Sequence, residues 1–131
     1  MTKKVIVTNK APAPVGPYNQ AIIATGKMVF VAGQIPLHPE SGEIIGIGDI
    51  AVQTKQVMAN LQAILQAATA NWEDVVKTTV YLSDLENFTA MNQVYAQYFQ
   101  DSTAPARATV EVARLPKDVL VEIDCIAVAS D

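Results

Sequence analysis

The chain has 131 residues, of which 50% are apolar and 17% are charged, and its net charge is −4. These values are typical of one globular domain, residues 1–131, and they exclude a disordered chain. Lysine and arginine form no cluster, which disfavours nucleic acid as a partner, and Cys125 is the single cysteine, so no disulfide can form within the chain.

The beginning of the chain lacks the apolar stretch of a signal peptide. No apolar run approaches the roughly 20 residues that a membrane helix needs. We therefore expect a cytoplasmic protein with no membrane partner.

The first third of the chain predicts strands and turns. "VIVT" (5–8) is typical of a short strand, and "NKAPAPVGPYNQ" (9–20) of an irregular loop rich in proline and glycine. The runs "QAIIAT" (20–25) and "MVFVAGQ" (28–34) flank a Gly-Lys pair and predict a β-hairpin. "LHPESGE" (37–43) predicts a second turn.

The period of the apolar residues changes at Asp49. Apolar residues then recur every three or four positions to Ala68, which predicts an amphipathic helix with Asp49 as its N-cap. "NWED" is typical of a capped turn, and the β-branched run 75–82 of a strand. "DLENF" opens a second helix, whose apolar stripe consists of Phe88, Met91, Val94, Tyr95, Tyr98 and Phe99.

Two further strands, 106–113 and 119–128, flank the segment "RLPKD". The resulting order, β-β-β-α-β-α-β-β, predicts an α+β fold in which two helices cover one face of a mostly antiparallel sheet. The last strand is apolar at nearly every position, a pattern of strands that are buried on both faces. Because two helices cover only one face, we expect another subunit to cover the second.

The familiar catalytic and metal-binding patterns are absent from the sequence. His38, the single histidine, lies in a predicted turn with no nucleophile placed beside it, so we interpret it as a solvated turn residue. No cysteine–histidine spacing indicates zinc. The glycines of "GIGD" precede a helix, but the lysine of a phosphate loop and the third glycine of a dinucleotide motif are missing.

Charged residues inside the last two strands are the remaining signal. Strand alternation puts Arg107, Thr109 and Glu111 on one face. In the last strand Glu122 and Asp124 share a face. A charge in a strand that is otherwise suited to burial must be paired, exposed at an edge or directed at a cavity.

Two interpretations of these charges stay open. In the first, Arg107 forms a structural ion pair with Glu122 or Asp124 across the sheet. In the second, Arg107 binds a carboxylate with its fork of N–H donors, and Glu122 orients or deprotonates a water molecule. Both can hold at once.

Three positions outside these strands are weaker candidates. Tyr18 lies in the proline- and glycine-rich loop, where it could serve packing alone. The segment "VAGQIP", which contains Gly33, could direct backbone N–H groups into a cleft or be a plain strand end. Asn92 lies among apolar positions of the second helix, where a solvated role is the alternative to ligand binding.

Four segments of the chain resemble the reactive intermediate deaminase family, also known as the RidA, YjgF or translation-inhibitor family. They are "APAPVGPYNQA", "VFVAGQIPLHPESGE", "VVKTTVYLSDLENFTAMNQVYAQYF" and "PARATVEVARLPKDVLVEIDCIAV". The resemblance covers nearly the whole chain, and "PARATVEVARLPKD" is its most specific block.

The resemblance implies a chorismate-mutase-like (YjgF-like) α+β fold and a homotrimer, in which the sheets form a central barrel and the clefts lie between subunits. The implied activity is hydrolysis of reactive enamines and imines, such as 2-aminoacrylate and 2-aminocrotonate, to 2-keto acids and ammonia. This activity protects pyridoxal-phosphate enzymes from damage. It needs neither a cofactor nor a metal.

The family's functional positions fall on six residues of this chain. Arg107 matches the arginine that binds the substrate carboxylate, and Glu122 the carboxylate near the attacking water. The substrate-binding positions match Tyr18, Gly33, Asn92, Arg107 and Thr109. Many members carry cysteine where this chain has Thr109, and an aromatic residue where it has Ala104. Chemistry that requires a thiol in the cleft is therefore not expected here.

Other functions remain compatible with the sequence. The same cleft could bind a keto acid or amino acid for regulation, without turnover. RNA cleavage and a chaperone-like role are further alternatives. The acidic balance and the lack of a histidine pair argue against RNA cleavage.

Overall fold

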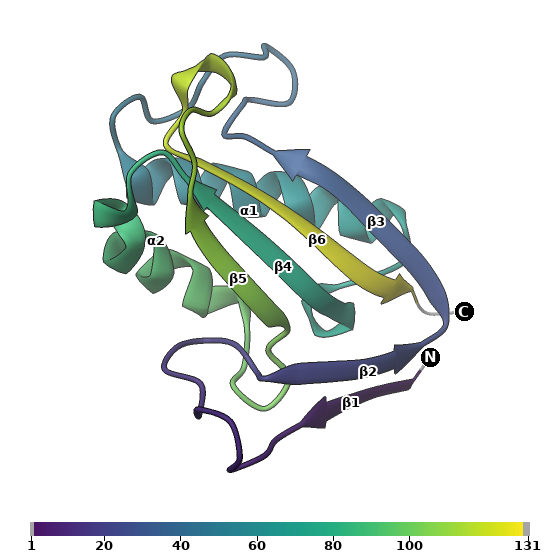
Figure 1. Ribbon diagram of the computed structural model, residues 1–131. Coiled ribbons are helices and arrows are strands. Elements are labelled where there is room, and N and C mark those ends of the chain that lie inside the picture. The colour runs from purple at the N-terminus through teal and green to yellow at the C-terminus, as the bar shows by residue number, and fades with distance from the viewer. Residues whose placement is uncertain (1, 130–131) are drawn as a thin grey trace.

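A computed structural model describes residues 2–129 and confirms the predicted order of elements (Figure 1). Short 3-10 turns at 72–74, 85–87, 96–98 and 116–118 join several of these elements. The strands and helices are β1 (Thr2–Ile6), β2 (Ala21–Thr25), β3 (Lys27–Gln34), α1 (Ile50–Ala67), β4 (Val75–Leu82), α2 (Phe88–Tyr95), β5 (Ala106–Glu111) and β6 (Val121–Ala129).

The main sheet has four strands in the order β3-β6-β4-β5. β6 runs antiparallel to both β3 and β4, whereas β4 and β5 are parallel. In Figure 1, α1 and α2 lie together on one face of this sheet. The prediction of an α+β fold, with two helices on one face of a mostly antiparallel sheet, is therefore confirmed.

The helices begin where their capping residues predict. The carboxylate of Asp49 accepts a hydrogen bond from the Val52 N–H at 3.1 Å, so Asp49 is the N-cap of α1. Asn71 and Asp74 form a reciprocal capping box around the short turn before β4. These local signals agree with the observed starts of α1 and of the 72–74 turn, whereas α2 begins without a side-chain cap.

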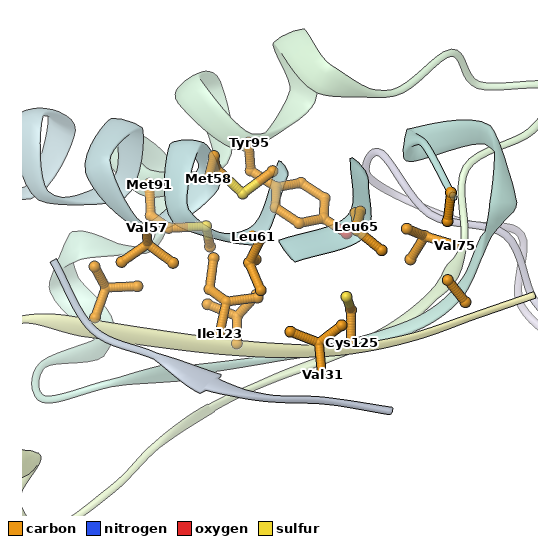
Figure 2. Close-up of a cluster of buried hydrophobic side chains, with 14 of the residues drawn as sticks. Val31, Val57, Met58, Leu61, Leu65, Val75, Met91, Tyr95, Ile123 and Cys125 are labelled. Carbon is orange, nitrogen blue, oxygen red and sulfur yellow. The ribbon is translucent and has the colours of Figure 1, made fainter. Parts of the chain in front are cut away.

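The hydrophobic core lies between the helices and the sheet (Figure 2). Met58 and Leu61 of α1 and Tyr95 of α2 approach the sheet from one side, and Ile123 and Cys125 of β6 meet them. All five side chains are buried. Burial also raises the pKa of the Cys125 thiol to about 12, so at neutral pH this cysteine is an unreactive thiol.

The predicted hairpin of β2 and β3 is wrong. β2 pairs with β1 in a separate two-stranded sheet, and β3 pairs with β6. Only Gly26, at φ 134°, separates the two strands, because Lys27 already pairs with Ala129. One residue is too short for the two-residue loop of a tight hairpin, so the chain bends at Gly26 into the second sheet and the two strands do not pair.

Lys3 connects β1 to the rest of the protein. Its ammonium group donates hydrogen bonds to the carbonyls of Glu73, Val75 and Thr103 at 2.9, 2.9 and 2.6 Å. These contacts use all three donors of the group, so we interpret Lys3 as structural.

The sheet face opposite the helices carries apolar side chains that no part of residues 2–129 covers. Phe30 is 74% exposed, Met28 47% and Val110 42%. The alternating residues of β6 on this face, Glu122 and Asp124, are half-buried. The prediction of a trimeric barrel concerns this face, and it stays a prediction.

Candidate functional site

Arg107 lies on the helix side of the sheet. It pairs in register with Thr78 of β4, whose hydroxyl is buried and lies 2.7 Å from the hydroxyl of Tyr95 in α2. Side chains paired across adjacent strands point to the same face. Strand alternation therefore directs Arg107 and Thr109 toward α2, and Ala108 toward the uncovered face.

The Arg107 guanidinium is held by neutral groups. Its Nη1 donates a hydrogen bond to Oδ1 of Asn92 at 2.6 Å. Its central carbon lies 4.8, 5.5 and 5.7 Å from the ring centres of Tyr95, Tyr18 and Phe88. The one ion pair within residues 2–129 joins Arg114 to Asp118 at an exposed turn, so no carboxylate of the described chain neutralises Arg107.

Burial lowers the pKa of the Arg107 guanidinium, and the nearby tyrosines act in the opposite direction. An arginine nevertheless stays protonated at any physiological pH, because its ordinary pKa exceeds 12. Arg107 is thus a half-buried positive charge without a matching negative one.

The proline- and glycine-rich loop brings Tyr18 to Arg107. The side-chain amide of Asn19 donates to the carbonyl of Ala104 at 2.8 Å, and its backbone N–H donates to the carbonyl of Pro105 at 3.2 Å. Both acceptors directly precede β5. The loop is therefore fastened to the strand that carries Arg107, which explains how residues 89 positions apart meet.

Together these residues line a hollow of about 230 Å³, which we call the arginine hollow. Its lining residues are Val15, Gly16, Tyr18, Phe88, Arg107 and Thr109. The Thr109 hydroxyl is buried and has no hydrogen-bond partner in the described chain. The arginine hollow thus offers one positive charge to a small ligand, and a hydroxyl without a hydrogen-bond partner is buried in its wall.

Glu122 and Gly33 meet on the opposite face of the same sheet. Glu122 pairs in register with Tyr81 of β4 and lies between the buried Val121 and Ile123, so it points away from the helices. A methyl group on Gly33 would lie 2.9 Å from the Glu122 carboxyl carbon. Glycine at position 33 therefore makes room for this carboxylate.

A second acidic group lies beside Glu122. The Tyr81 hydroxyl donates a hydrogen bond to Asp124 at 3.0 Å, which raises the pKa of the tyrosine. Burial, and then the negative charge of Asp124, raise the pKa of Glu122 above its usual value. We call the set Gly33, Tyr81, Glu122 and Asp124 the carboxylate face.

The structure tests the first of the two interpretations of the strand charges, and the second stays a prediction. An ion pair of Arg107 with Glu122 or Asp124 within one chain is wrong, because the arginine and the two carboxylates point to opposite faces of the sheet. Of the six candidate positions, Tyr18, Asn92, Arg107 and Thr109 come together, and Gly33 and Glu122 come together elsewhere. The candidate residues of one chain therefore form two separate groups.

Phe88 and Tyr95 also contact Arg107, although the sequence predicted them only as part of the apolar stripe of the second helix. With Asn92 they occupy positions i, i+4 and i+7 of α2, which form one face of a helix. A polar asparagine between two aromatic residues on that face was the available signal. The contact with Arg107 depends on how α2 packs on β5, which the helical period does not specify.

The hollow that includes His38 shows no comparable chemistry. A larger hollow, of about 590 Å³, lies between α1 and the end of β3 and includes His38. Nδ1 of His38 accepts hydrogen bonds from the N–H groups of Glu40 and Ser41, as expected for a turn residue. Across residues 2–129 no cluster of acidic, histidine or cysteine side chains could hold a metal ion, and none of the helices there could cross a membrane.

Comparison with known proteins assigns the fold to a family. The family model described as Endoribonuclease L-PSP matches residues 8–129. A RutC family protein from Synechocystis is 62% identical over 128 residues, which cover 98% of each chain. The chain belongs to the Endoribonuclease L-PSP family.

Other relatives in this family carry more specific names. The 2-iminobutanoate/2-iminopropanoate deaminase of Escherichia coli is 46% identical over 95% of this chain and 97% of its own. The crystal structure of E. coli TdcF with bound serine is 45% identical, with a TM-score of 0.72 over 97% of this chain and 99% of that one. The resemblance to the reactive intermediate deaminases, a part of the L-PSP family, is thus confirmed.

Proposed function

We propose that the protein is a hydrolytic deaminase of small 2-imino acids, such as the imine forms of 2-aminoacrylate and 2-aminocrotonate. The observation that supports this most is the unpaired Arg107 in the arginine hollow. A half-buried guanidinium whose charge nothing in its own chain neutralises is suited to bind a carboxylate through two parallel hydrogen bonds. The 46% identity with the E. coli deaminase supports the same reaction.

The chemistry requires little more than positioning. Water adds to the imine carbon and one of its protons moves to the nitrogen. The second proton then moves from the hydroxyl of the tetrahedral adduct to the nitrogen, and the carbon–nitrogen bond breaks to give ammonia and the 2-keto acid. The imine carbon is already electrophilic, so fixing the substrate and the water next to each other supplies much of the acceleration. Arg107 would hold the carboxylate, and Glu122 would accept a hydrogen bond from the attacking water.

In this proposal, the arginine hollow and the carboxylate face that form one complete site come from two copies of the chain. Arg107 and Glu122 of one chain lie on opposite faces of its sheet, so the Glu122 that serves an arginine hollow would come from a neighbouring chain. The exposed Phe30, Met28 and Val110 on the uncovered face are suited to such an interface. We therefore infer a homotrimer with its clefts between subunits, as the family resemblance implies.

The alternative is a binding protein without turnover, and the bound serine of TdcF supports it. Arg107 would serve either function equally well. RNA cleavage, despite the family's description, has less support in this chain. Its net charge is −4, and its single histidine accepts two backbone hydrogen bonds in a turn.

Ammonia release distinguishes these functions. 2-Aminoacrylate is generated in place by a serine dehydratase, and ammonia and pyruvate are followed with and without the protein. We expect the wild-type protein to accelerate release and Arg107→Ala to remove the acceleration. Arg114→Ala, which changes an exposed arginine paired with Asp118, is the matched control. A wild-type protein that binds 2-oxobutyrate but does not accelerate release would establish the binding function instead.

A further inference from the structure

Arg107 is unusual in how its charge is accommodated. A half-buried guanidinium loses part of its hydration, and proteins usually compensate with a carboxylate. Here the compensation comes from the ring faces of Tyr18, Phe88 and Tyr95, at 4.8 to 5.7 Å, and from one amide oxygen. Aromatic faces attract a cation through their quadrupole but carry no net charge.

We propose that Phe88 and Tyr95 are positioning residues of the arginine hollow. Their rings hold the Arg107 guanidinium in place without neutralising its charge, so that it can bind a singly charged carboxylate. The proposal rests on the proposed function, and it adds the residues that set the affinity and the charge class of the ligand. Neither residue needs to touch the reacting atoms.

The surroundings of Tyr95 make it a rigid support. Its side chain is fully buried, its hydroxyl lies 2.7 Å from that of Thr78, and its ring packs against Phe99 at 4.9 Å. Thr78 is the register partner of Arg107. The ring is thereby anchored to the strand next to the arginine, so the guanidinium rests on a surface that cannot easily shift.

Phe88 is the ring that also borders the hollow. It lies 5.7 Å from the guanidinium carbon and, with Tyr18 and Thr109, lines the space that a ligand would occupy. Asn92, one turn further along α2, takes one of the five guanidinium N–H groups. The Phe88 ring and the Asn92 amide thus constrain the guanidinium from the side of α2, and its other N–H groups stay available to the ligand.

The charge balance of the hollow selects the ligand class. Among residues 2–129, Arg107 is the only charged residue that lines it. One positive charge with a neutral hydroxyl suits a carboxylate, whereas a phosphate dianion calls for more positive charge. Carboxylate and phosphate are both within the chemistry of an arginine fork, so the experiment includes both anions.

The test measures binding rather than turnover. Calorimetry gives the Kd of 2-oxobutyrate for the full-length wild-type protein and for Phe88→Leu, Phe88→Tyr and Tyr98→Leu. Phe88→Leu keeps an apolar side chain but removes the π face, and Phe88→Tyr restores it. Tyr98→Leu is the control, because it removes a half-buried aromatic residue that packs against Trp72 and has no such contact with Arg107.

We expect Phe88→Leu to weaken 2-oxobutyrate binding by about five- to ten-fold. Phe88→Tyr and Tyr98→Leu should stay within about two-fold of wild type. Equal losses in Phe88→Leu and Tyr98→Leu would overturn the proposal, and so would a failure of Phe88→Tyr to restore binding. Inorganic phosphate should bind more weakly than 2-oxobutyrate, and tighter phosphate binding would overturn the ligand class.

Tyr95→Phe provides a second variant that keeps the core filled. It retains the ring and loses only the hydroxyl contact with Thr78. We expect binding within about three-fold of wild type, because the π face carries the interaction. A loss as large as that of Phe88→Leu would mean that the hydroxyl rather than the ring is responsible. Ring-dependent binding without ammonia release would refute the deaminase function and leave this proposal standing.

Discussion

The arginine hollow and the carboxylate face are built on the same sheet but differ in nearly every respect. The arginine hollow lies on the helix side, where α2 and the loop around Tyr18 surround one positive charge with aromatic rings. The carboxylate face lies on the uncovered side, where Glu122 and Asp124 stand next to each other without a cation paired to either.

The difference indicates that each region lacks what the other provides. Within residues 2–129 the positive region has no carboxylate within ion-pair distance, and the negative region has no arginine or lysine within that distance. A charge left unpaired in a partly buried place costs free energy unless a ligand or partner compensates it. Two copies that juxtapose these regions would compensate both, and a substrate could lie between them.

Mixing two inactive variants gives the largest expected effect. Arg107→Ala and Glu122→Gln should each lower deaminase activity by about 100-fold or more. When equal amounts are unfolded together and refolded, about a quarter of the clefts should combine an intact Arg107 with an intact Glu122, because a heterologous interface takes one residue from each chain. Activity per chain should then return to about that fraction of wild type.

The separately refolded variants, mixed without exchange of subunits, are the control for this experiment. If both residues of a site came from one chain, every chain in the mixture would carry one defect. Co-refolded protein with no more activity than the separate variants would therefore contradict the division of the site between chains.

The steric fit between Gly33 and Glu122 predicts the next largest effect. A methyl group at position 33 would lie 2.9 Å from the Glu122 carboxyl carbon, so Gly33→Ala should push the carboxylate aside. Because that side chain is flexible, we expect little change in Tm but a fall in kcat of about ten-fold or more. A Gly33→Ala variant whose kcat equals that of wild type would contradict this role of Gly33.

Local signals made most of the fold predictable from the sequence. The strand 75–82 and the start of α1 at Asp49 follow from β-branched composition, helical period and capping. The pairing of strands was not predictable in the same way. β2 and β3 are adjacent in sequence, yet each pairs with a strand elsewhere, since the partner of a strand depends on contacts that the chain makes only when it is folded.

The candidate site was also predictable only in part from the sequence. Alternation correctly grouped Arg107 with Thr109 and separated both from Ala108. It could not establish that Arg107 and Glu122 face opposite sides, because this depends on the register of both strands against β4. The aromatic support from Phe88 and Tyr95 depends in addition on how α2 packs on the sheet.

The unused hydroxyl of Thr109 predicts opposite effects on stability and binding. It is buried without a hydrogen-bond partner, so Thr109→Val should raise the free energy of unfolding by about 1 kcal/mol. If the hydroxyl is reserved for the ligand, 2-oxobutyrate should bind about three- to five-fold more weakly. Chemical denaturation and calorimetry measure the two quantities, and Thr89→Val, at an exposed position of α2, is the control. A variant that is more stable and binds as tightly as wild type would leave Thr109 with no part in binding.

The smallest expected effect concerns the titration of Glu122. Burial and the negative charge of Asp124 both raise the pKa of this carboxyl, so it gains its proton at a higher pH than an ordinary glutamate. Asp124→Asn removes the second cause and keeps the first, and the midpoint should therefore move to lower pH while staying above the usual value. The carboxyl carbon can be followed by NMR, with Glu122→Gln identifying its signal.

A cation from a neighbouring copy would act in the opposite direction and lower the pKa of Glu122. A midpoint in the wild-type assembly that lies below that of an ordinary glutamate would mean that Arg107 of the next chain pairs directly with Glu122, rather than sharing a substrate or water with it.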